Sequence, residues 1–329
     1  MMNSILLAAA LGGLVGGPGQ VPGAVSAVCD ANGRVTVECA GLADVAAKRP
    51  MRPDTMFWIA SNTKGVAAAT LLTLVDEGKV ALDDPAAKYI AGFPAGVTVR
   101  HLLSHTSGLP FFPGMPIDAK SVQLLAQMAI RAKADGKPGE KYGYSNWGID
   151  CAMAIVEVVT GEPFEKVMKD RILDPLGMTD TTFFPNDEQV ARLASYYDFE
   201  KLMLIDQLQY PYTLRGRYAE AGGGLFSTAG DMIRFFRMIA AKGVGPDGRR
   251  ILSEKSIAEW SRKQTGAHIK NSYSFGMDVD EAKGILSHGG AAGTYGEANV
   301  KDGTSRVLFI QFRGDWQAID DLRTKWKGA

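Results

Sequence analysis

The chain has 329 residues, of which 46% are hydrophobic and 22% charged, so it can bury a large core and has the composition of an ordinary globular protein. Its 36 basic and 36 acidic residues give a formal net charge of zero. Because nucleic-acid binding requires a basic patch and no cluster of lysine and arginine stands out, we exclude nucleic acid as a partner. Small substrates that are neutral or of mixed charge fit this composition better.

The chain has three cysteines, Cys29, Cys39 and Cys151, so at least one thiol is unpaired. Residues 30–33, with the sequence Asp-Ala-Asn-Gly, predict a hairpin turn in which Cys29 faces about Arg34. Cys39 then lies too far along the second strand for a disulfide with Cys29. We therefore expect all three cysteines to be reduced.

The first 19 residues contain an apolar run at 5–11 that resembles the core of a signal peptide. No lysine or arginine precedes this run, and it is too short to cross a bilayer. We therefore favour a short buried N-terminal helix over a cleaved leader. The expected protein is soluble and without stable membrane insertion, and a cytoplasmic location is favoured over a periplasmic or secreted one.

The predicted elements begin with two strands, at 23–29 and 35–40, because small and β-branched residues dominate both runs. A short apolar run at 56–59 follows. A helix is predicted from Ser61 to Glu77, where apolar residues continue among alanines without a break, and Gly78 is typical of a helix end.

The middle of the chain is predicted to be helical. Capping residues mark three helix starts, which are Asp84 with a proline after it, Thr98, and Thr228 with an aspartate three residues later. Two more helices, at 150–160 and 162–172, are separated by Gly161. Short strands follow at 274–280, 285–287, 296–300 and 306–312, and an amphipathic helix at 316–326 ends the chain.

Strands at both ends and helices between them predict an α/β (α+β) fold in which both termini contribute to one sheet and a helical lobe is inserted. We expect a single domain over 20–329. Its sheet lobe comprises about 20–80 and 265–329, and its helical lobe about 81–264. Residues 1–19 form the N-terminal helix or signal-like segment.

The first candidate motif is Ser61 with Lys64, three residues apart at a predicted helix start, so that their side chains share one face. A serine hydroxyl is a poor nucleophile until a base takes its proton. A lysine one turn away can be that base, or can hold another base in place, if burial lowers its pKa. At the helix start the backbone N–H of Ser61 is also free to face a developing oxyanion.

The second motif is Tyr144-Ser145-Asn146, which follows a turn. Tyr144 can serve as a general base if a cation such as Lys64 stabilises its phenolate. The amide of Asn146 can hydrogen-bond Lys64 or a substrate carbonyl. Tyr142 is the competing tyrosine, and a packed aromatic residue at a helix start is the alternative interpretation of Tyr144.

The third motif is Ser287-His288-Gly289-Gly290-Ala291, at the end of a predicted strand. Gly289 and Gly290 would allow a substrate to lie against the strand edge, and the N–H of Ala291 would complete an oxyanion hole. A simple β-turn is the alternative for this motif taken alone.

Together the three motifs resemble the superfamily of serine β-lactamases, DD-peptidases and family VIII carboxylesterases, most closely its class C-like branch. The resemblance extends over about residues 20–315. The further segments that match in the expected order are 20–25, 51–64, 99–110, 138–146, 174–179 and 222–231. This resemblance implies a β-lactamase/transpeptidase-like fold with an antiparallel sheet flanked by helices.

The resemblance also implies roles for the motif residues. Ser61 would be the acylated nucleophile, Lys64 its activating partner and Tyr144 the general base. Asn146, His288, Gly289 and Gly290 would orient the substrate, and the N–H groups of Ser61 and Ala291 would form the oxyanion hole.

One position departs from the family pattern. His288-Gly289-Gly290 stands where true β-lactamases and DD-peptidases have Lys-Thr-Gly, whose lysine helps to bind a substrate carboxylate. A histidine is mostly neutral at pH 7 unless its pKa is raised. We therefore expect the substrate to be a small ester or amide rather than a penicillin, and deacylation to use Tyr144 and Lys64.

Two other patterns do not predict a binding site. His101 and His105 have the spacing of a helical metal pair, but no glutamate follows His101 and no third ligand is evident. The glycines at 222–224 lack the lysine of a phosphate-binding loop and indicate close packing or a loop near the cleft. No cofactor or metal is expected.

Four functions remain open at this point. The first is a carboxylesterase-like serine hydrolase that forms an acyl-Ser61 intermediate. The second is a β-lactamase, or a peptidase or amidase for D-amino acids, with the same mechanism. The third is a covalent β-lactam sensor without turnover, and the fourth is an inactive member, disfavoured because Ser61, Lys64, Tyr144 and Asn146 are all present.

Overall fold

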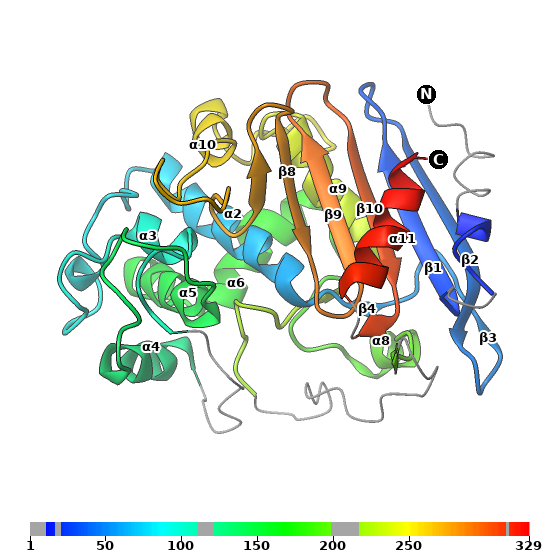
Figure 1. Ribbon diagram of the computed structural model, residues 1–329, viewed down its shortest axis with the longest axis horizontal. Coiled ribbons are helices and arrows are strands. Elements are labelled where there is room, and N and C mark those ends of the chain that lie inside the picture. Colours follow the sequence, from blue (N-terminus) through cyan, green and yellow to red (C-terminus); the bar gives the residue numbers. More distant parts are fainter. Residues whose placement is uncertain (1–10, 17–20, 111–120, 199–216, 314–315, 329) are drawn as a thin grey trace.

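The computed structural model describes residues 11–16, 21–110, 121–198, 217–313 and 316–328 (Figure 1). Its main sheet has seven antiparallel strands in the order β3-β2-β1-β10-β9-β8-β7. The strands are β1 (Gly23–Cys29), β2 (Val35–Asp44), β3 (Arg49–Pro50), β7 (Asp278–Asp280), β8 (Ile285–Gly289), β9 (Thr294–Asn299) and β10 (Ser305–Ile310). Since β1 pairs with β10, the prediction of one sheet built from both ends of the chain is confirmed.

Side chains of β10 alternate between two hydrophobic cores, as the period of a strand requires. Val307 and Phe309 belong to the larger core, whereas Leu308 and Ile310 belong to the smaller one. The helix α11 (Trp316–Gly328) covers the smaller core and lies in front of the sheet in Figure 1. The helix α9 (Ala229–Ala240) packs on β1, β9 and β10 from the side of the larger core.

Eight further helices are described, and most of them lie to the left of the sheet in Figure 1. They are α2 (Thr63–Asp76), α3 (Val99–Leu103), α4 (Val122–Arg131), α5 (Asn146–Thr160), α6 (Phe164–Met168), α7 (Asp174–Leu176), α8 (Asp187–Ala191) and α10 (Glu254–Trp260). Short pairs of strands join β4 (Phe57–Trp58) to β6 (Phe226–Ser227) and β5 (Tyr197–Asp198) to β11 (Phe312–Arg313). The short turns are η1 (Ala60–Asn62), η2 (Ala86–Lys88) and the π-helical η3 (Lys169–Leu173).

The central helix α2 is buried on every side, from Thr63 to Leu74. A helix that is apolar all round belongs in a core rather than at the surface. It packs among α5, α6, η3 and α10. The two predicted lobes group α2 with the sheet and α9 with the helices. In the structure α9 packs on the sheet and α2 packs among helices.

Most predicted boundaries are close to the observed ones. Thr98 and Thr228 do cap α3 and α9, and Gly161 ends α5 in the left-handed conformation. The prediction that Asp84 caps a helix is wrong. The residue before η2 is Pro85, and the Asp84 carboxylate instead accepts hydrogen bonds from Ala81 N–H and Lys88.

The strand predicted at 274–280 is shorter than expected. Ser274 N–H donates to Met277 C=O across a turn in which Gly276 has φ +65°. Only β7 (Asp278–Asp280) is therefore left to pair with β8.

The cysteine prediction is confirmed. Cys29 pairs with Val35, and Cys39 pairs with Val25 four positions further along, so no disulfide joins them. All three thiols are free.

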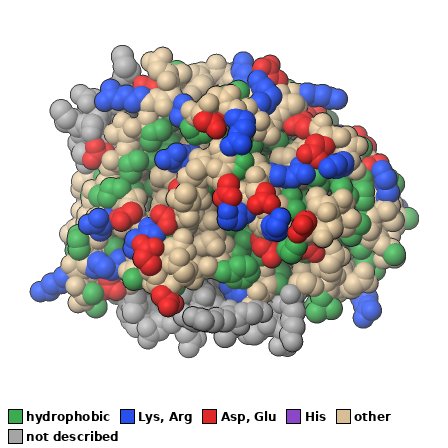
Figure 2. All heavy atoms as spheres, turned by 180° about the vertical axis from the view of Figure 1, so that it is seen from behind, with side chains coloured by type: hydrophobic (Ala, Val, Ile, Leu, Met, Phe, Trp, Pro, Cys, Tyr) green, Lys and Arg blue, Asp and Glu red, His purple; other side chains and the backbone are tan. Residues whose placement is uncertain are grey.

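The N-terminal prediction is tested only at its end, because residues 1–10 lie outside the described part. Leu11 and Leu14 are buried in the smaller core with Trp326. Within the described ranges no helix has both the length and the apolar character needed to cross a bilayer. On the face seen in Figure 2, basic and acidic side chains are interspersed, as the balanced composition predicts.

Candidate active site

Ser61 lies in the turn η1, between the short strand β4 and the central helix α2. The residue before it, Ala60, has φ +47°, a left-handed conformation that a non-glycine residue adopts only at some cost. The Thr63 hydroxyl donates to the Ala60 carbonyl at 2.6 Å and accepts from Leu225 N–H at 3.1 Å. The turn that carries Ser61 is thus held from within α2 and from the segment before β6.

The structure brings Ser61, Lys64 and Tyr144 together. Lys64 Nζ lies 3.1 Å from Ser61 Oγ, and the Tyr144 hydroxyl donates to the same oxygen at 2.9 Å. Lys64 Nζ also donates to the carbonyl of Gly222 and lies 4.6 Å from the centre of the Tyr144 ring. Both partners of Ser61 are therefore in place for proton transfer.

Burial gives these two partners different protonation behaviour. Lys64 is fully buried, and this lowers its pKa from 10.5 to about 7, against the raising effect of Glu220 and Asp150. Burial raises the pKa of the Tyr144 phenol, so that Tyr144 carries its proton at pH 7. At neutral pH Lys64 can accept a proton, whereas Tyr144 can donate one.

The position of Tyr144 follows from the start of α5. Ser145 caps this helix by accepting from Gly148 N–H, and Ser145 N–H donates to His105 Nδ1 at 3.1 Å. The His105 ring then packs on the Tyr144 ring with 4.4 Å between their centres. The competing Tyr142 packs edge-on against His105 at 5.9 Å, whereas Tyr144 is the tyrosine whose hydroxyl donates to Ser61.

Asn146 is the first residue of α5, and its amide has another partner than Lys64. Asn146 Nδ2 donates to Glu220 Oε1 at 3.3 Å, rather than Lys64 donating to Asn146. Its side chain lies against Gly222, where an added Cβ would be 2.8 Å from Asn146 Cγ. Asn146 Oδ1 is buried and has no hydrogen-bond partner among the described residues. This oxygen is thus the free polar atom of the side chain.

His288 is buried at the end of β8, and both of its ring nitrogens have partners within the chain. Nδ1 lies 2.7 Å from the Gly289 carbonyl and Nε2 lies 3.0 Å from the Tyr273 hydroxyl. A carbonyl only accepts, so Nδ1 carries the proton and Nε2 accepts from Tyr273. Burial and the neighbouring Lys64 lower the pKa of His288 to about 3, so it is neutral at physiological pH.

The glycines after His288 are needed for a reason that the sequence pattern does not reveal. A Cβ at Gly290 would lie 2.3 Å from the carbonyl of Ile59, and one at Gly289 would lie 2.8 Å from the Arg323 guanidinium. The Thr294 hydroxyl donates to the Ile59 carbonyl at 2.9 Å, which ties the start of β9 to the residues before Ser61. Ala291 lies in the turn between β8 and β9.

Several residues around the site were not predicted. The set comprises His105, Asp150, Glu220 and Tyr273. One usable signal was present, because Asp150 interrupts an apolar helical run and buried acidic residues are rare. For the glycines at 222–224 the sequence predicts close packing or a loop near the cleft. Gly222 does pack closely, because it lies against Asn146, and its carbonyl accepts from Lys64.

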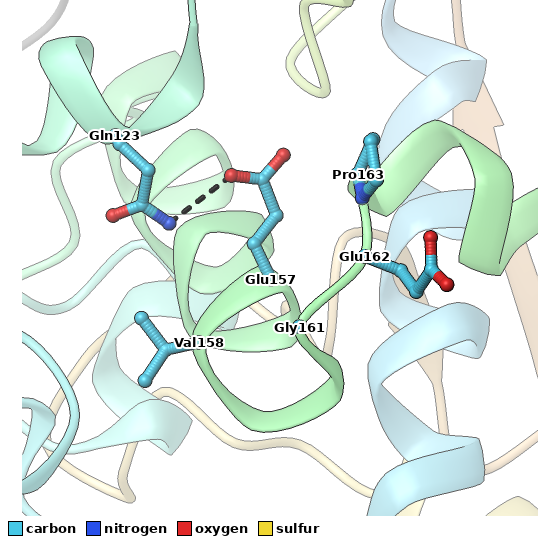
Figure 3. A pocket seen from close by; sticks show the side chains of 6 residues that line it. All are labelled: Gln123, Glu157, Val158, Gly161, Glu162 and Pro163. Carbon is cyan, nitrogen blue, oxygen red and sulfur yellow. Dashed lines mark hydrogen bonds between the residues drawn. The ribbon is translucent and has the colours of Figure 1, made fainter.

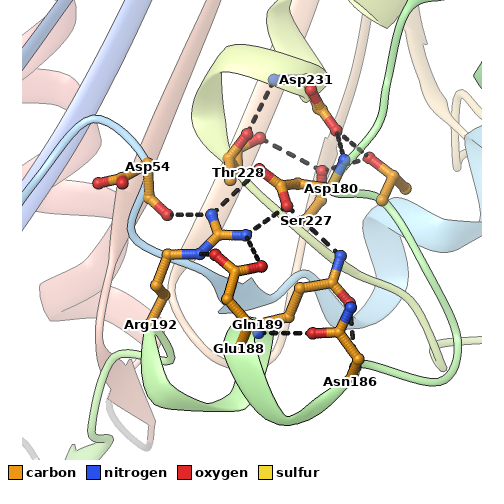
Figure 4. Close-up of polar contacts among 10 residues, drawn as sticks. Asp54, Asp180, Asn186, Glu188, Gln189, Arg192, Ser227, Thr228 and Asp231 are labelled. Atoms are coloured by element: carbon orange, nitrogen blue, oxygen red, sulfur yellow. Dashed lines mark hydrogen bonds and ion pairs between the residues drawn. The ribbon is translucent and has the colours of Figure 1, made fainter.

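The strand before Ser61 is braced by a polar network (Figure 4). Asp231 accepts from Asp180 N–H at 2.8 Å and from the Thr181 hydroxyl at 3.0 Å. Thr181 also bonds Ser227, and Ser227 pairs with Phe57 in β4. The network therefore fixes the strand pair that leads into the turn that carries Ser61.

Other polar clusters do not extend the site. A hollow of about 330 Å³ lies between α4 and α5 and is lined by Gln123, Glu157, Val158, Gly161, Glu162 and Pro163 (Figure 3). The carboxylate of Glu157 in this hollow already accepts hydrogen bonds from Gln123 and from Phe164 N–H. The described residues contain no cluster of histidine, cysteine and acidic side chains that could hold a metal, and His101 instead serves in the cap of α3.

Comparisons with known proteins agree with this geometry. The sequence profile of the Beta-lactamase family matches residues 11–327. Protein Rv1367c of Mycobacterium tuberculosis is 33% identical over 271 residues, which cover 73% of this chain and 67% of that protein. Esterase EstB of Burkholderia gladioli is 30% identical over 312 residues, which cover 78% of this chain and 77% of the esterase.

A solved structure extends the likeness to the fold. EstCE1, described as a hydrolase with promiscuous acyltransferase activity, matches with a TM-score of 0.81 at 22% identity and covers 100% of this chain and 99% of its own. The fold is that of the β-lactamases and transpeptidases, and the protein is a serine hydrolase. The chain belongs to the Beta-lactamase family, whose profile matches nearly its full length.

Proposed function

We propose that this protein hydrolyses small carboxylic esters or amides through an acyl-Ser61 intermediate. The observation that carries the proposal is the pair of contacts on Ser61 Oγ, at 3.1 Å from Lys64 Nζ and 2.9 Å from the Tyr144 hydroxyl. The 30% identity to the esterase EstB supports the ester as substrate class.

In acylation, neutral Lys64 takes the hydroxyl proton of Ser61 while Oγ attacks the substrate carbonyl carbon. The Tyr144 hydroxyl then gives its proton to the leaving oxygen or nitrogen as the carbonyl bond to that atom breaks. Lys64 is now an ammonium and Tyr144 a phenolate, and the ammonium beside the ring stabilises the phenolate. The family resemblance implies Tyr144 as the base. The raised pKa of Tyr144 and the lowered pKa of Lys64 instead support Lys64 as the base and Tyr144 as the acid in acylation.

Deacylation restores both groups without any further proton source. The Tyr144 phenolate takes a proton from a water molecule, whose oxygen attacks the acyl carbon. As the acyl–oxygen bond to Ser61 breaks, the Lys64 ammonium returns its proton to Oγ. The products are the free acid and an enzyme in its starting state.

The developing oxyanion would be stabilised by the backbone N–H groups of Ser61 and Ala291. The contact between Thr294 and the Ile59 carbonyl supports this assignment, because it joins the two segments that supply these donors. Preorganised donors of this kind are worth on the order of 10²-fold in rate or more.

The uncharged His288 supports esters and simple amides over β-lactams. A substrate carboxylate is bound best by a cation, and His288 is uncharged with both nitrogens occupied. We therefore place penicillins and cephalosporins below short-chain esters in preference.

The test uses three substrates with the wild-type protein and a Ser61→Ala variant. These are p-nitrophenyl acetate, a chromogenic cephalosporin and a D-alanyl p-nitroanilide, and turnover is followed together with intact mass. We expect ester turnover to exceed the other two and to fall by on the order of 10³-fold or more in the variant. Faster cephalosporin or anilide turnover would identify the substrate as a β-lactam or a D-amino-acid amide.

Two further outcomes would overturn the proposal. Equal ester rates in the wild type and the Ser61→Ala variant would exclude Ser61 as the nucleophile. A stable adduct of the cephalosporin on Ser61, without turnover of any substrate, would identify a covalent sensor instead.

A further inference from the structure

Two buried carboxyl groups lie next to Lys64 and have no role in the mechanism above. Glu220 is 3% exposed and Asp150 is 1% exposed, and both lie within electrostatic reach of Lys64. An isolated buried carboxylate is costly, so a pair of them beside a buried amine requires an explanation.

Glu220 is connected to the site through Asn146. Its Oε1 accepts from Asn146 Nδ2 at 3.3 Å, which turns the Asn146 amide so that Oδ1 is left free. Glu220 also begins the segment whose Gly222 carbonyl accepts from Lys64. It therefore lies where a negative charge faces both the amide and the amine.

Asp150 holds the same segment from the other side. Its Oδ1 accepts from Ala221 N–H at 2.8 Å, and the Gly222 N–H also donates to this carboxyl group. Its Oδ2 is buried without a hydrogen-bond partner among the described residues. A bare buried oxygen costs far less on a neutral acid than on a carboxylate, and burial beside Glu220 raises the pKa of Asp150.

We propose that Glu220 is the buried counter-charge of Lys64, and that Asp150 is a neutral brace that fixes the segment from Glu220 to Gly222. Both are positioning residues for the hydrolysis, so the inference rests on the proposed function. A lysine buried without a counter-charge becomes a weak base, with a pKa of roughly 5–6. Glu220 keeps the basicity of Lys64 near neutrality, where a general base is most effective.

The charge that Lys64 experiences comes from several elements. The ionisable groups that face it are Tyr144 and Asp150 on α5 and the loop before it, Glu220 on the segment before β6, His105 after α3, and His288 on β8. Both histidines are held neutral by burial, and Tyr144 keeps its proton. Glu220 is thus the group in this set that can balance a Lys64 ammonium.

The experiment measures the titration of Lys64 directly and does not depend on turnover. The protein is labelled with [¹³C]lysine, and the Cε resonance of Lys64 is assigned by its loss in a Lys64→Arg variant. In Glu220→Gln, which keeps an acceptor for Asn146, we expect the midpoint of the Lys64 titration to fall by about one pH unit. In Asp150→Asn, which replaces a neutral acid, we expect the midpoint to stay within about 0.3 units while kcat falls.

Two controls keep the result interpretable. Glu157→Gln removes a carboxylate from the same helix as Asp150 but away from Lys64, and we expect it to leave the midpoint and the kcat/KM profile unchanged. Glu220→Asp retains the charge and should retain the midpoint within about 0.3 units. If Glu220→Gln does not fold, ¹³C-carboxyl titration of the wild-type protein must still show one aspartic acid that remains protonated at pH 7.

An unchanged midpoint of the Lys64 titration in Glu220→Gln would overturn the assignment of Glu220 as the counter-charge. Equal shifts in Glu220→Gln and Asp150→Asn would overturn the assignment of Asp150 as the neutral member. A shifted midpoint in a protein whose Ser61 is never acylated would instead refute the proposed function and leave the counter-charge standing.

Discussion

The two flanks of Ser61 differ in how they carry charge. On the side of α5, the ionisable groups Lys64, Asp150 and Glu220 are buried together, and the charge of each affects the protonation of the others. On the side of β8, His288 is neutral, and the Arg323 guanidinium beside the strand end is already paired with an aspartate. Under the proposed function, proton transfer and substrate selection lie on separate segments, so we expect each to be changeable without the other.

The largest effect is expected on the charged flank. Lys64→Met removes the base that takes the Ser61 proton, and kcat/KM for p-nitrophenyl acetate should fall by about 10⁴-fold. Steady-state kinetics with matched circular dichroism spectra measure this loss. A variant that retains more than a tenth of the wild-type rate would show that another group activates Ser61.

Tyr144→Phe separates the acid from the base. Its loss should lower kcat/KM for an ethyl ester by about 10³-fold, because a poor leaving group needs the proton. For a p-nitrophenyl ester, whose leaving group needs no proton, the fall should stay below about tenfold. The matched control Tyr142→Phe should leave both values close to wild type, and a uniform loss with both esters would argue against Tyr144 as the acid.

The pH profile tests the same flank in the wild-type protein. Lys64 must be neutral to act as a base, and its pKa is about 7, so kcat/KM should rise with pH and level off above 8. At pH 5 the value should lie about 100-fold below the plateau, since each unit below the pKa costs a factor of ten. Rates that are flat between pH 5 and 8 would contradict Lys64 as the base.

Gly290→Ala tests how the segment after β8 positions Ser61. The new Cβ would meet the Ile59 carbonyl at 2.3 Å, so the turn before Ser61 must shift, and kcat/KM should fall by about 10²-fold. Gly143→Ala is the matched control, because nothing lies within 4 Å of a Cβ there. Equal activities of the two variants would show that this contact does not position Ser61.

The smallest effect on activity is expected from His288→Gln. Because His288 is already neutral, kcat/KM and its acid limb should change by less than about threefold. Stability should respond instead. The folded pKa of about 3 lies below the unfolded value of about 6.5, so the unfolded state binds the proton first as pH falls.

This linkage has a measurable size. Between pH 6.5 and 5, His288 should reduce the free energy of unfolding by about 1.5 kcal/mol. Urea denaturation at both pH values measures the loss, and His288→Gln should abolish that part of it. A variant with the same loss as wild type would show that His288 does not carry this pH dependence.

Much of the site could be predicted because its residues lie in short local patterns. Ser61 and Lys64 are one helical turn apart, and Tyr144 and Asn146 precede an apolar helix. Asp150 and Glu220 could not be recognised as neighbours, since 70 residues separate them and only the packing of α5 on the segment before β6 joins them.

The fold shows the same limit. The strands at both ends predicted one sheet, because alternation and turn residues are local signals. The packing of α9 on the sheet depends on which surface is left open after the strands have paired, and no local pattern records that. The need for glycine at position 290 could not be predicted either, because the neighbour that requires it is the backbone of Ile59, which is distant in the sequence.

The hydrogen bond between Thr294 and Ile59 spans 235 positions of the chain, and β1 pairs with β10 across a similar separation. Contacts of such high sequence separation form late in folding, since a long loop must close first. During synthesis the nucleophile leaves the ribosome long before the strands that hold it. The nascent chain should therefore remain chemically inert, and hydrolytic competence should arise only when the C-terminal strands have joined the sheet.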